Sequence, residues 1–269
     1  MSLLSFSNGL LPPVASLVLL TFASSCLLFL QPLPSNANSL ISCHFEKIYN
    51  FGNSILDTGN LIRQKPIGAA SACARLPYGE TFFKYATGRC SNGRLMIDFI
   101  ANASGLPFLN PYLEKDADFR HGVDFAVAGA TALPAKVLAK QNIVDPETNS
   151  SLEVQLGKGI QEVKVLVPKV VAAIMSGVRR VISRYGAVGV IVPGLFPRGF
   201  DGESTRKACC GIGGDYNFNA SRQCSPEVPV CLNPNKLISW DGIHLTEAVY
   251  KRMTEWLMND MLPKLKCGV

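Results

Sequence analysis

The sequence predicts an α/β fold in a single domain, because strand-like and helix-like patterns alternate along it. Short apolar runs at 47–51, 123–128 and 187–192 read as strands, and amphipathic helical patterns lie between and after them. The run at 187–192 is rich enough in valine for a buried parallel strand. With 269 residues, 48% of them hydrophobic and 17% charged, the chain has the composition of a globular protein.

The N-terminal segment is the most apolar part of the chain. No charged residue occurs from Val14 to Leu30, and the small residues Ser35 and Ala37 follow, as at a signal peptidase site. We therefore predict a signal peptide at 1–37 and one secreted domain at 38–269, extracellular or in the cell wall, with no stable membrane span after removal of the signal peptide. A signal anchor is the alternative, since no Lys or Arg precedes the run and its length is close to that of a spanning helix.

The net charge of +6 lies entirely outside the predicted signal peptide. Excess positive charge on a secreted protein favours acidic cell-wall polysaccharide or anionic surfaces as partners, although it equally serves ordinary solubility. No run of basic residues occurs, so the sequence gives no indication of nucleic-acid binding.

Cysteine usage agrees with an oxidising compartment. Eight cysteines remain after the signal peptide, an even number that predicts disulfides. Four of them cluster between 209 and 231, but without paired C-x-x-C spacing or a nearby histidine, so we predict no metal and no cofactor. Three Asn-x-Ser sequons are candidate glycosylation sites. They begin at Asn102, Asn149 and Asn219.

A serine follows the first predicted strand. The run at 47–51 ends at Gly52-Asn53-Ser54, and a helix is expected over 55–62, whose N-terminal amides would face the Ser54 hydroxyl. Ser54 is therefore a candidate nucleophile, or simply the serine that caps this helix.

The next helix is expected over 95–103, where apolar residues recur at helical spacing directly after Ser91-Asn92-Gly93-Arg94. The Gly93 N–H could join the Ser54 N–H as a donor to a tetrahedral oxyanion. Gly93 is equally well explained as a turn glycine before the helix.

Further along, the strand at 123–128 leads into a turn at 129–131, and the longest helical pattern covers 161–185. No regular structure is predicted at 133–159 or 193–234. The last helix is expected to begin near Thr246 as its N-cap. Its predicted buried residues are Val249, Met253, Trp256 and Leu257.

The catalytic base is the easiest residue to assign, because the chain has only three histidines. Of these, only His244 has a carboxylate, Asp241, at a spacing that could orient its imidazole, as a general base requires. His244 could then take the proton of Ser54 while Asp241 stabilises the imidazolium. Asp241 and His244 are expected on the loop just before the final helix, where catalytic residues are common.

Four blocks in this order, Ile48 to Asn60, Gly88 to Arg94, Gly122 to Ala132 and Ser239 to Thr246, resemble the plant GDSL-type esterases and lipases of the SGNH hydrolase superfamily. The resemblance implies a flavodoxin-like three-layer α/β/α fold with a mostly parallel sheet. It also implies hydrolysis of carboxylic esters by Ser54, His244 and Asp241, with Ser54 and Gly93 in the oxyanion hole. The substrates implied are small-molecule or lipid esters, and the chain is most similar to the branch acting on acetylated or phenolic plant esters.

The chain departs from this family in two ways. Asn53 stands where the family name implies aspartate, and the Gly-x-Asn-Asp block, whose asparagine completes the oxyanion hole, does not occur. We infer an internally shortened esterase, with residues missing near 133–160 and 197–201. The three predicted strands fall short of the roughly five that such a sheet needs, so the sheet is predicted to be incomplete.

Two functions follow from these observations. The first is a secreted serine esterase, weakened by the missing asparagine, since loss of one oxyanion donor lowers kcat about 10² to 10³-fold. The second is a non-catalytic secreted protein that keeps a groove for esters or polysaccharide.

Overall fold

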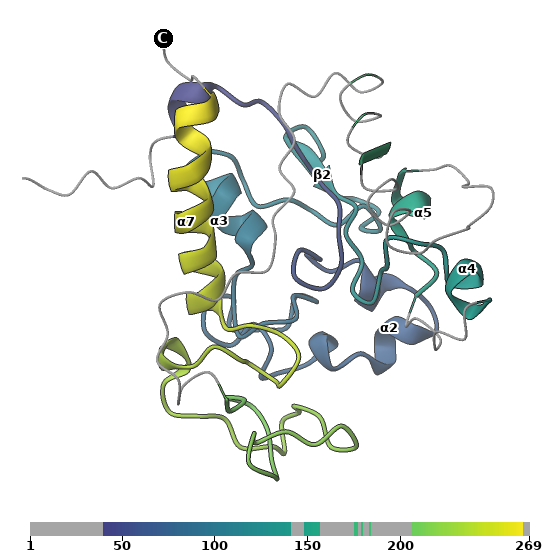
Figure 1. Cartoon of the computed structure of the whole chain (residues 1–269), viewed down its shortest axis with the longest axis vertical. Helices are drawn as coiled ribbons and strands as arrows, with labels where there is room; N and C mark the ends of the chain where they lie inside the picture. Colours follow the sequence, from purple (N-terminus) through teal and green to yellow (C-terminus); the bar gives the residue numbers. More distant parts are fainter. Residues whose placement is uncertain are drawn as a thin grey trace, which may run out of the picture. The chain divides into compact units, whose positions relative to one another are not determined.

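The computed structural model of the chain describes residues 40–140, 148–156, 175–176, 179, 183 and 206–265. The described residues all belong to one compact unit. Its helices and strands are joined by extensive turns (Figure 1). The strands are β1 (Ile48–Asn50) and β2 (Gly122–Asp124). The helices are α2 (Ile67–Ala70), α3 (Met96–Ala103), α4 (Ala135–Ala139), α5 (Leu152–Leu156) and α7 (Glu247–Leu265). Short 3-10 turns occur at Ile41–Cys43, Leu61–Arg63, Ala72–Ala74 and Pro234–Lys236.

The two strands form a parallel pair, as the sequence predicts. Ile48 lies opposite Gly122, and the ladder continues beyond the strands, because Phe125 donates its N–H to the Asn50 carbonyl at 2.8 Å and Val127 to that of Gly52 at 3.1 Å. The predicted turn at 129–131 follows, closed by the Ala130 N–H on the Val127 carbonyl. The third predicted strand, at 187–192, lies outside the described residues.

The helix predicted over 55–62 is wrong. Turns fill this stretch and end in the 3-10 turn at 61–63. The cause is Asp57, whose buried carboxylate accepts the N–H groups of Gly59, Asn60 and Leu61, so those amides are not available to a helix. Asn60 then reaches across to the Asp124 and Ala126 carbonyls and ties the turn to β2. In the described part of the chain, no helix begins directly after Ser54.

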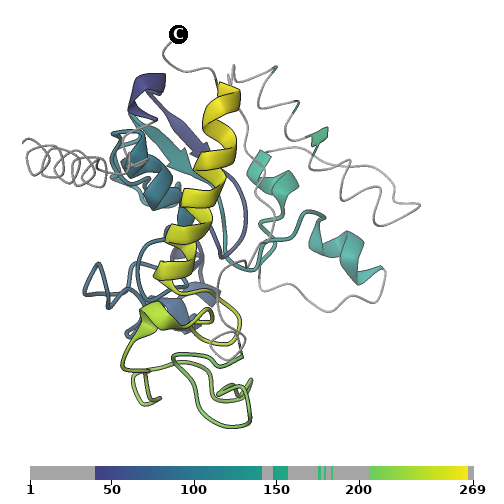
Figure 2. The same ribbon diagram turned by 60° about the vertical axis from the view of Figure 1, so that its left-hand side comes forward.

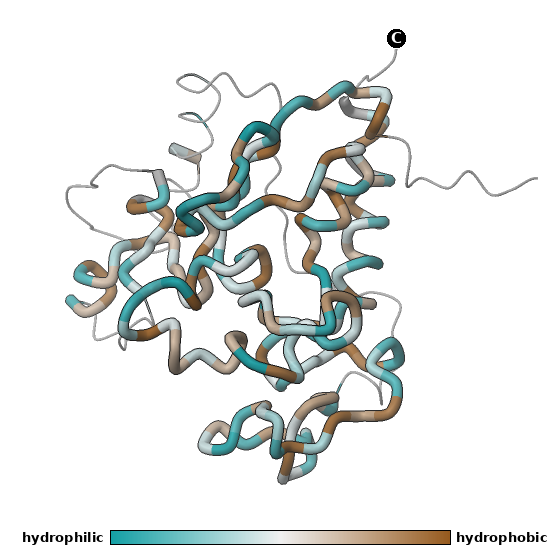
Figure 3. Tube along the Cα trace, turned by 180° about the vertical axis from the view of Figure 1, so that it is seen from behind, coloured by the Kyte–Doolittle hydropathy of each residue, from teal (hydrophilic) through white to brown (hydrophobic). Residues whose placement is uncertain are grey.

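Helices α3 and α7 lie side by side (Figures 1 and 2). Helix α3 confirms the prediction at 95–103, and it begins where the Asp98 carboxylate accepts the Leu95 N–H at 2.8 Å. Polar and apolar residues alternate along α7, as Figure 3 shows. The apolar sides of both helices enclose a cluster that excludes water and fixes the start of α7. Its fully buried members are Leu95, Met96, Ile97, Leu109, Ile238, Val249, Tyr250 and Met253.

The final helix was predicted correctly in position but not in detail. Val249 and Met253 are buried and Leu257 is partly buried, whereas Trp256 is 51% exposed. Residues 249, 253 and 257 recur every four positions and lie on one side of the helix, which leaves position 256 at its edge. Thr246 stands in the predicted N-cap position, since α7 begins at Glu247 and the Thr246 carbonyl accepts the Tyr250 N–H at 3.1 Å, while its hydroxyl donates to the Leu237 carbonyl.

Two stretches predicted to lack regular structure differ from each other. The first contains the short helices α4 and α5, each of five residues, which are too short to give a helical period in the sequence. In the second, the described part at 206–233 has no helix or strand, as predicted. The long predicted helix at 161–185 falls mostly outside the described residues. Met175, Ser176, Arg179 and Ser183 are described there, and all four are helical.

Disulfides confirm the prediction from cysteine usage. Three bonds lie within the described ranges, and Cys43 is bonded as well. They join Cys73 to Cys90, Cys209 to Cys231 and Cys210 to Cys224. Among the described helices, none is both long and apolar enough to cross a membrane.

Candidate active site

The loop before α7 brings Asp241 and His244 together. The His244 Nδ1 lies 2.7 Å from the Asp241 Oδ2, while the Asp241 Oδ1 accepts the N–H groups of Ile243 at 2.9 Å and His244 at 2.6 Å. Gly242, at φ +93°, makes this tight turn possible. With Nδ1 engaged by the carboxylate, the Nε2 of His244 is left to face a substrate or nucleophile.

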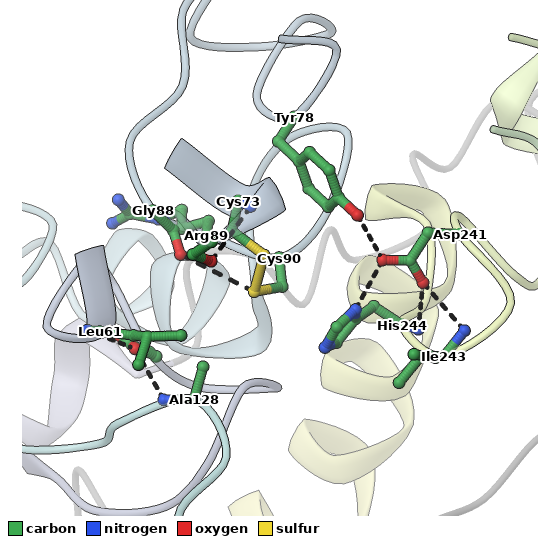
Figure 4. The surroundings of a disulfide bond; sticks show 12 residues. Leu61, Cys73, Tyr78, Gly88, Arg89, Cys90, Ala128, Asp241, Ile243 and His244 are labelled. Carbon is green, nitrogen blue, oxygen red and sulfur yellow. Dashed lines mark hydrogen bonds and ion pairs between the residues drawn. A yellow bond between two sulfur atoms is a disulfide. The ribbon is translucent and has the colours of Figure 1, made fainter. Parts of the chain in front are cut away.

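Tyr78 completes the surroundings of the carboxylate. Its hydroxyl donates to the Asp241 Oδ2 at 2.7 Å, and its ring packs edge-on against Trp240, with ring centroids 6.1 Å apart. Figure 4 shows Tyr78 from above and His244 from below meeting at the same oxygen of Asp241. Burial raises the pKa of Asp241, but the hydrogen bond and charge of His244, followed by the hydrogen bond from Tyr78, outweigh burial and bring that pKa to about 2. Asp241 is therefore ionised at any pH at which His244 could act as a base.

Two disulfide-bonded cysteines support this loop through backbone hydrogen bonds. Cys209 donates its N–H to the Ser239 carbonyl at 3.0 Å, and Cys210 donates to the Trp240 carbonyl at 2.6 Å. Trp240 in turn donates its N–H to the His244 carbonyl at 2.8 Å, which closes the loop on itself. Since Cys209 and Cys210 are each bonded to another cysteine, the backbone that supports Asp241 is covalently anchored.

The segment with the predicted oxyanion glycine is held against the start of α7. Asn92 accepts the Glu247 N–H at 2.8 Å and thus caps the helix from outside, and Arg94 forms an ion pair with the Glu247 carboxylate. Gly93 fits directly against Glu247, so that a Cβ here would collide with the carboxylate. Its N–H points to the Ser91 hydroxyl at 3.4 Å, a long hydrogen bond that competes with the predicted role toward an oxyanion.

Ser54 lies half-buried in the turn after β1. The Asn53 carbonyl accepts the N–H groups of Leu56 and Asp57, and the Asn53 side chain accepts that of Ile55 at 3.3 Å. Asparagine and aspartate both offer this acceptor oxygen, which accounts for Asn53 at this position. Among the described residues, none forms a hydrogen bond with the Ser54 hydroxyl.

A glutamine from α5 anchors the same turn two residues earlier. The Gln155 carboxamide accepts the Gly52 N–H at 3.0 Å and donates to the Gly52 carbonyl at 2.9 Å. This two-way pairing resembles a strand contact and fixes the chain that leads into Ser54.

Comparison with known proteins places this chain in a family. The sequence profile described as GDSL-like Lipase/Acylhydrolase matches residues 48–172. Acetylajmalan esterase 1 of Rauvolfia serpentina is 33% identical, with 84% of this chain and 89% of the relative covered, and acetylajmalan esterase 2 of the same plant is 34% identical, with 88% and 96% covered. The GDSL esterase/lipase At1g28570 of Arabidopsis thaliana is 32% identical, with 83% and 88% covered.

The chain belongs to the GDSL lipase/acylhydrolase family. It is therefore a carboxylic ester hydrolase by family, with the three-layer α/β/α fold of that family, to which β1 and β2 contribute a parallel pair. The alignment with acetylajmalan esterase 1 extends over 338 positions, more than the 269 residues of the whole chain, so this GDSL relative has internal residues without a counterpart here.

The candidate site residues do not all lie equally close to one another. Asp241 and His244 are in direct contact, and Gly93 lies against the helix that follows them. Ser54 reaches the same neighbourhood less directly: Ile55 and Leu245, the residues after Ser54 and His244, pack against one buried cluster. Within the described chain, Ser54 and His244 share no hydrogen bond.

Sequence reasoning missed Tyr78 and Gln155. Tyr78 is 163 positions from Asp241, and Gln155 is 103 positions from Gly52, so no local spacing connects either pair. The usable indication for Tyr78 is chemical: a buried aspartate needs hydrogen-bond donors to both carboxylate oxygens, and a buried tyrosine needs a partner for its hydroxyl. For Gln155 we find no comparable pattern in the sequence.

Proposed function

We propose that this chain is a secreted serine esterase that hydrolyses acetyl esters of small molecules with Ser54, His244 and Asp241. The observation that carries the proposal is the buried Asp241 carboxylate, which accepts four hydrogen bonds and presents His244 with its Nδ1 engaged. The relatives named acetylajmalan esterases support an acetyl ester on a small molecule rather than a polysaccharide.

In this mechanism the Ser54 Oγ attacks the ester carbonyl carbon while its proton passes to the His244 Nε2. Asp241 stabilises the imidazolium through Nδ1. The tetrahedral intermediate then expels the alcohol, which takes the proton from His244, and water releases the acyl group from Ser54 by the same steps. The oxyanion would be held by the N–H groups of Ser54 and Gly93, which requires Gly93 to release Ser91.

Secretion and glycosylation belong to the same proposal. The disulfides support an oxidising compartment. The side chains of Asn102, Asn149 and Asn219 are all exposed, as glycan acceptors must be. Treatment of the plant-expressed protein with a glycosidase, followed by mass measurement, tests this directly.

A chromogenic acetyl ester tests the enzymatic proposal. The wild type should turn it over, and Ser54→Ala should lower kcat by about 10³-fold or more. Ser183→Ala is the matched control, because Ser183 is exposed and its hydroxyl donates to the Arg179 carbonyl, four residues earlier. Equal turnover in wild type and Ser54→Ala would refute Ser54 as the nucleophile.

A non-catalytic ester-binding protein is the second candidate. It is favoured by the Ser54 hydroxyl, which has no partner among the described residues, and by the Gly93 N–H, which is directed at Ser91. Absence of turnover together with saturable binding of the acetyl ester would support this function over the first.

We also infer that the chain is an internally shortened product of an esterase gene. The alignment that extends beyond the length of this chain supports this inference, as does the absence of a Gly-x-Asn-Asp block. Sequencing the transcript and gene around codons 156 to 160 and 196 to 201 tests it. Skipped coding segments are expected at both places, and uninterrupted coding through both would overturn the inference.

A further inference from the structure

We propose that Tyr78 is a positioning residue for the catalytic pair, acting as the fourth donor that holds the Asp241 carboxylate in line with His244. This inference rests on the proposed Ser54–His244–Asp241 mechanism and adds to it a residue that touches neither substrate nor Ser54. Its basis is the hydrogen bond from the Tyr78 hydroxyl to the Asp241 Oδ2 (Figure 4).

The geometry around Asp241 leaves the carboxylate one orientation. Oδ1 accepts two backbone N–H groups from its own loop, at 2.6 and 2.9 Å. Oδ2 accepts His244 and Tyr78, both at 2.7 Å. A local turn alone would hold Oδ1 and leave Oδ2 to His244 alone. Tyr78 supplies the only contact to Oδ2 in the described chain that comes from a distant segment.

Tyr78 is itself fixed, which a positioning residue requires. It is 2% exposed and packs edge-on against Trp240, and its ring is large and nearly rigid. The Cys73–Cys90 disulfide closes the loop that carries it. Gly79, the next residue, donates its N–H to the Ser91 carbonyl at 2.9 Å. The loop therefore links Asp241 to the segment that contains Gly93.

The protonation state of Tyr78 suits this role. Burial, followed by the charge of Asp241 and the hydrogen bond to it, raises the pKa of Tyr78, so the hydroxyl remains a donor throughout the working range. The titratable groups that face Asp241 in the described chain are His244, Tyr78 and Tyr250. Donation by Tyr78 draws charge from the carboxylate, so its removal leaves Asp241 a stronger hydrogen-bond and charge partner for the imidazolium.

Tyr78→Phe tests the proposal, with Tyr250→Phe as the matched control. Tyr250 is also fully buried and lies near the Leu245 amide, but its hydroxyl makes no hydrogen bond of standard geometry. For Tyr78→Phe we expect kcat to fall about ten-fold with KM changed less than about three-fold, because a hydrogen bond to a charged group is lost. The acid limb of kcat/KM should move about half a pH unit upward. Tyr250→Phe should change neither.

An acid limb that stays at its wild-type pH in Tyr78→Phe, or that moves equally in Tyr250→Phe, overturns the proposal. If Tyr78→Phe does not fold, 3-fluorotyrosine at position 78 keeps the shape and donates more strongly. The acid limb should then move downward, and no movement or an upward one contradicts the proposal.

The positioning role can also be separated from the esterase proposal. If the wild type shows no turnover, the NMR signal of the His244 Nδ1 proton, which lies in the hydrogen bond to Asp241, still reports on Tyr78. A signal that is displaced in Tyr78→Phe but not in Tyr250→Phe supports the positioning role even though the esterase proposal has failed. A signal at the same position in wild type and Tyr78→Phe overturns the positioning role itself.

Discussion

The Asp241 loop and the Ser54 turn are both anchored by buried polar groups, but with different results. In the loop, four donors converge on a carboxylate that contacts the His244 imidazole. In the turn, Gln155 and Asp57 fix the backbone on either side of Ser54, yet the hydroxyl itself has no partner in the described residues. The difference teaches that the proposed base is oriented by its own surroundings, whereas the proposed nucleophile depends on what approaches it.

Asp241→Asn should give the largest effect, because it removes the group on which the loop converges. The amide has one acceptor oxygen where the carboxylate has two, so it cannot accept both the two backbone N–H groups and the pair of His244 and Tyr78. The imidazole also loses its charge partner, and kcat should fall about 10³ to 10⁴-fold. The measurement is turnover of the chromogenic acetyl ester. Asp118→Asn, at an exposed ion pair with Arg120, is the control and should retain full activity. A loss of kcat below ten-fold in Asp241→Asn would mean that this loop does not supply the general base.

Arg89→Met should most strongly weaken the support of the Ser54 turn. Arg89 forms a buried two-point ion pair with Asp98 and donates to the Thr58 carbonyl, so it connects α3 to the turn. Its removal leaves Asp98 buried without its countercharge, which costs about 3 to 5 kcal/mol of unfolding free energy. Urea denaturation measures this change. Arg120→Met, at the exposed pair, should leave the denaturation midpoint unmoved, and an equal shift in both variants would show that burial of Arg89 is unimportant.

The pH dependence of stability should have opposite signs in the two regions. Burial, and then the charge of Asp57, raise the pKa of Asp124 beside the Ser54 turn to about 7 from an ordinary value of 3.8. The folded state thus binds a proton more tightly, and unfolding free energy should rise as pH falls from 8 to 5, by up to about 1 kcal/mol per unit. Asp241 has a lowered pKa, so its contribution to the unfolding free energy is complete above pH 3.8 and is lost only as the pH falls toward 2.

Urea denaturation of wild type and Asp124→Asn at pH 5, 6, 7 and 8 isolates the Asp124 contribution. The stability advantage of wild type should be largest at pH 5 and shrink as pH rises through 7. An advantage that stays constant from pH 5 to 8 would show that Asp124 is ionised throughout this range and stabilised by Thr58 and Asn50, which donate to it.

Gln155→Ala should give the smallest effect, since it removes two neutral hydrogen bonds from Gly52 and leaves Ser54 in place. A net loss near 1 kcal/mol corresponds to about a five-fold lower kcat. The rate of Ser54 labelling by a fluorophosphonate should fall in proportion. Val154→Ala, at an exposed position on the same helix, is the control. An unchanged labelling rate in Gln155→Ala would show that the turn holds Ser54 without α5.

Much of the scaffold was predictable because its determinants are local. The strands at 48–50 and 122–124 and the helices at 96–103 and 247–265 follow from apolar spacing that the structure uses directly. The Asp241–His244 contact was predictable because the two residues are three positions apart and histidine is scarce. The turn at 129–131 after β2 was predictable for the same reason, since the residues that form it are neighbours in the sequence.

The failures that concern the site involve side chains that find partners far away in the sequence. The helix expected at 55–62 gave way to Asp57, Asn60 and Thr58, whose hydrogen bonds reach Asp124 and its neighbours on β2. Gln155 and Tyr78 likewise find partners across the fold. Such contacts depend on how elements pack, which local spacing in a single sequence does not reveal.

The consecutive cysteines 209 and 210 have a practical consequence for anyone who prepares this enzyme. Their backbone N–H groups donate to the carbonyls of Ser239 and Trp240, and their sulfur atoms form two separate disulfides. A chain that matures with these partners exchanged would carry its histidine on a displaced loop while retaining the same mass. A purified batch can therefore be uniform by weight and mixed in competence, and the fraction of sites that titrate with a covalent inhibitor, rather than the protein concentration, is the proper denominator for its turnover number.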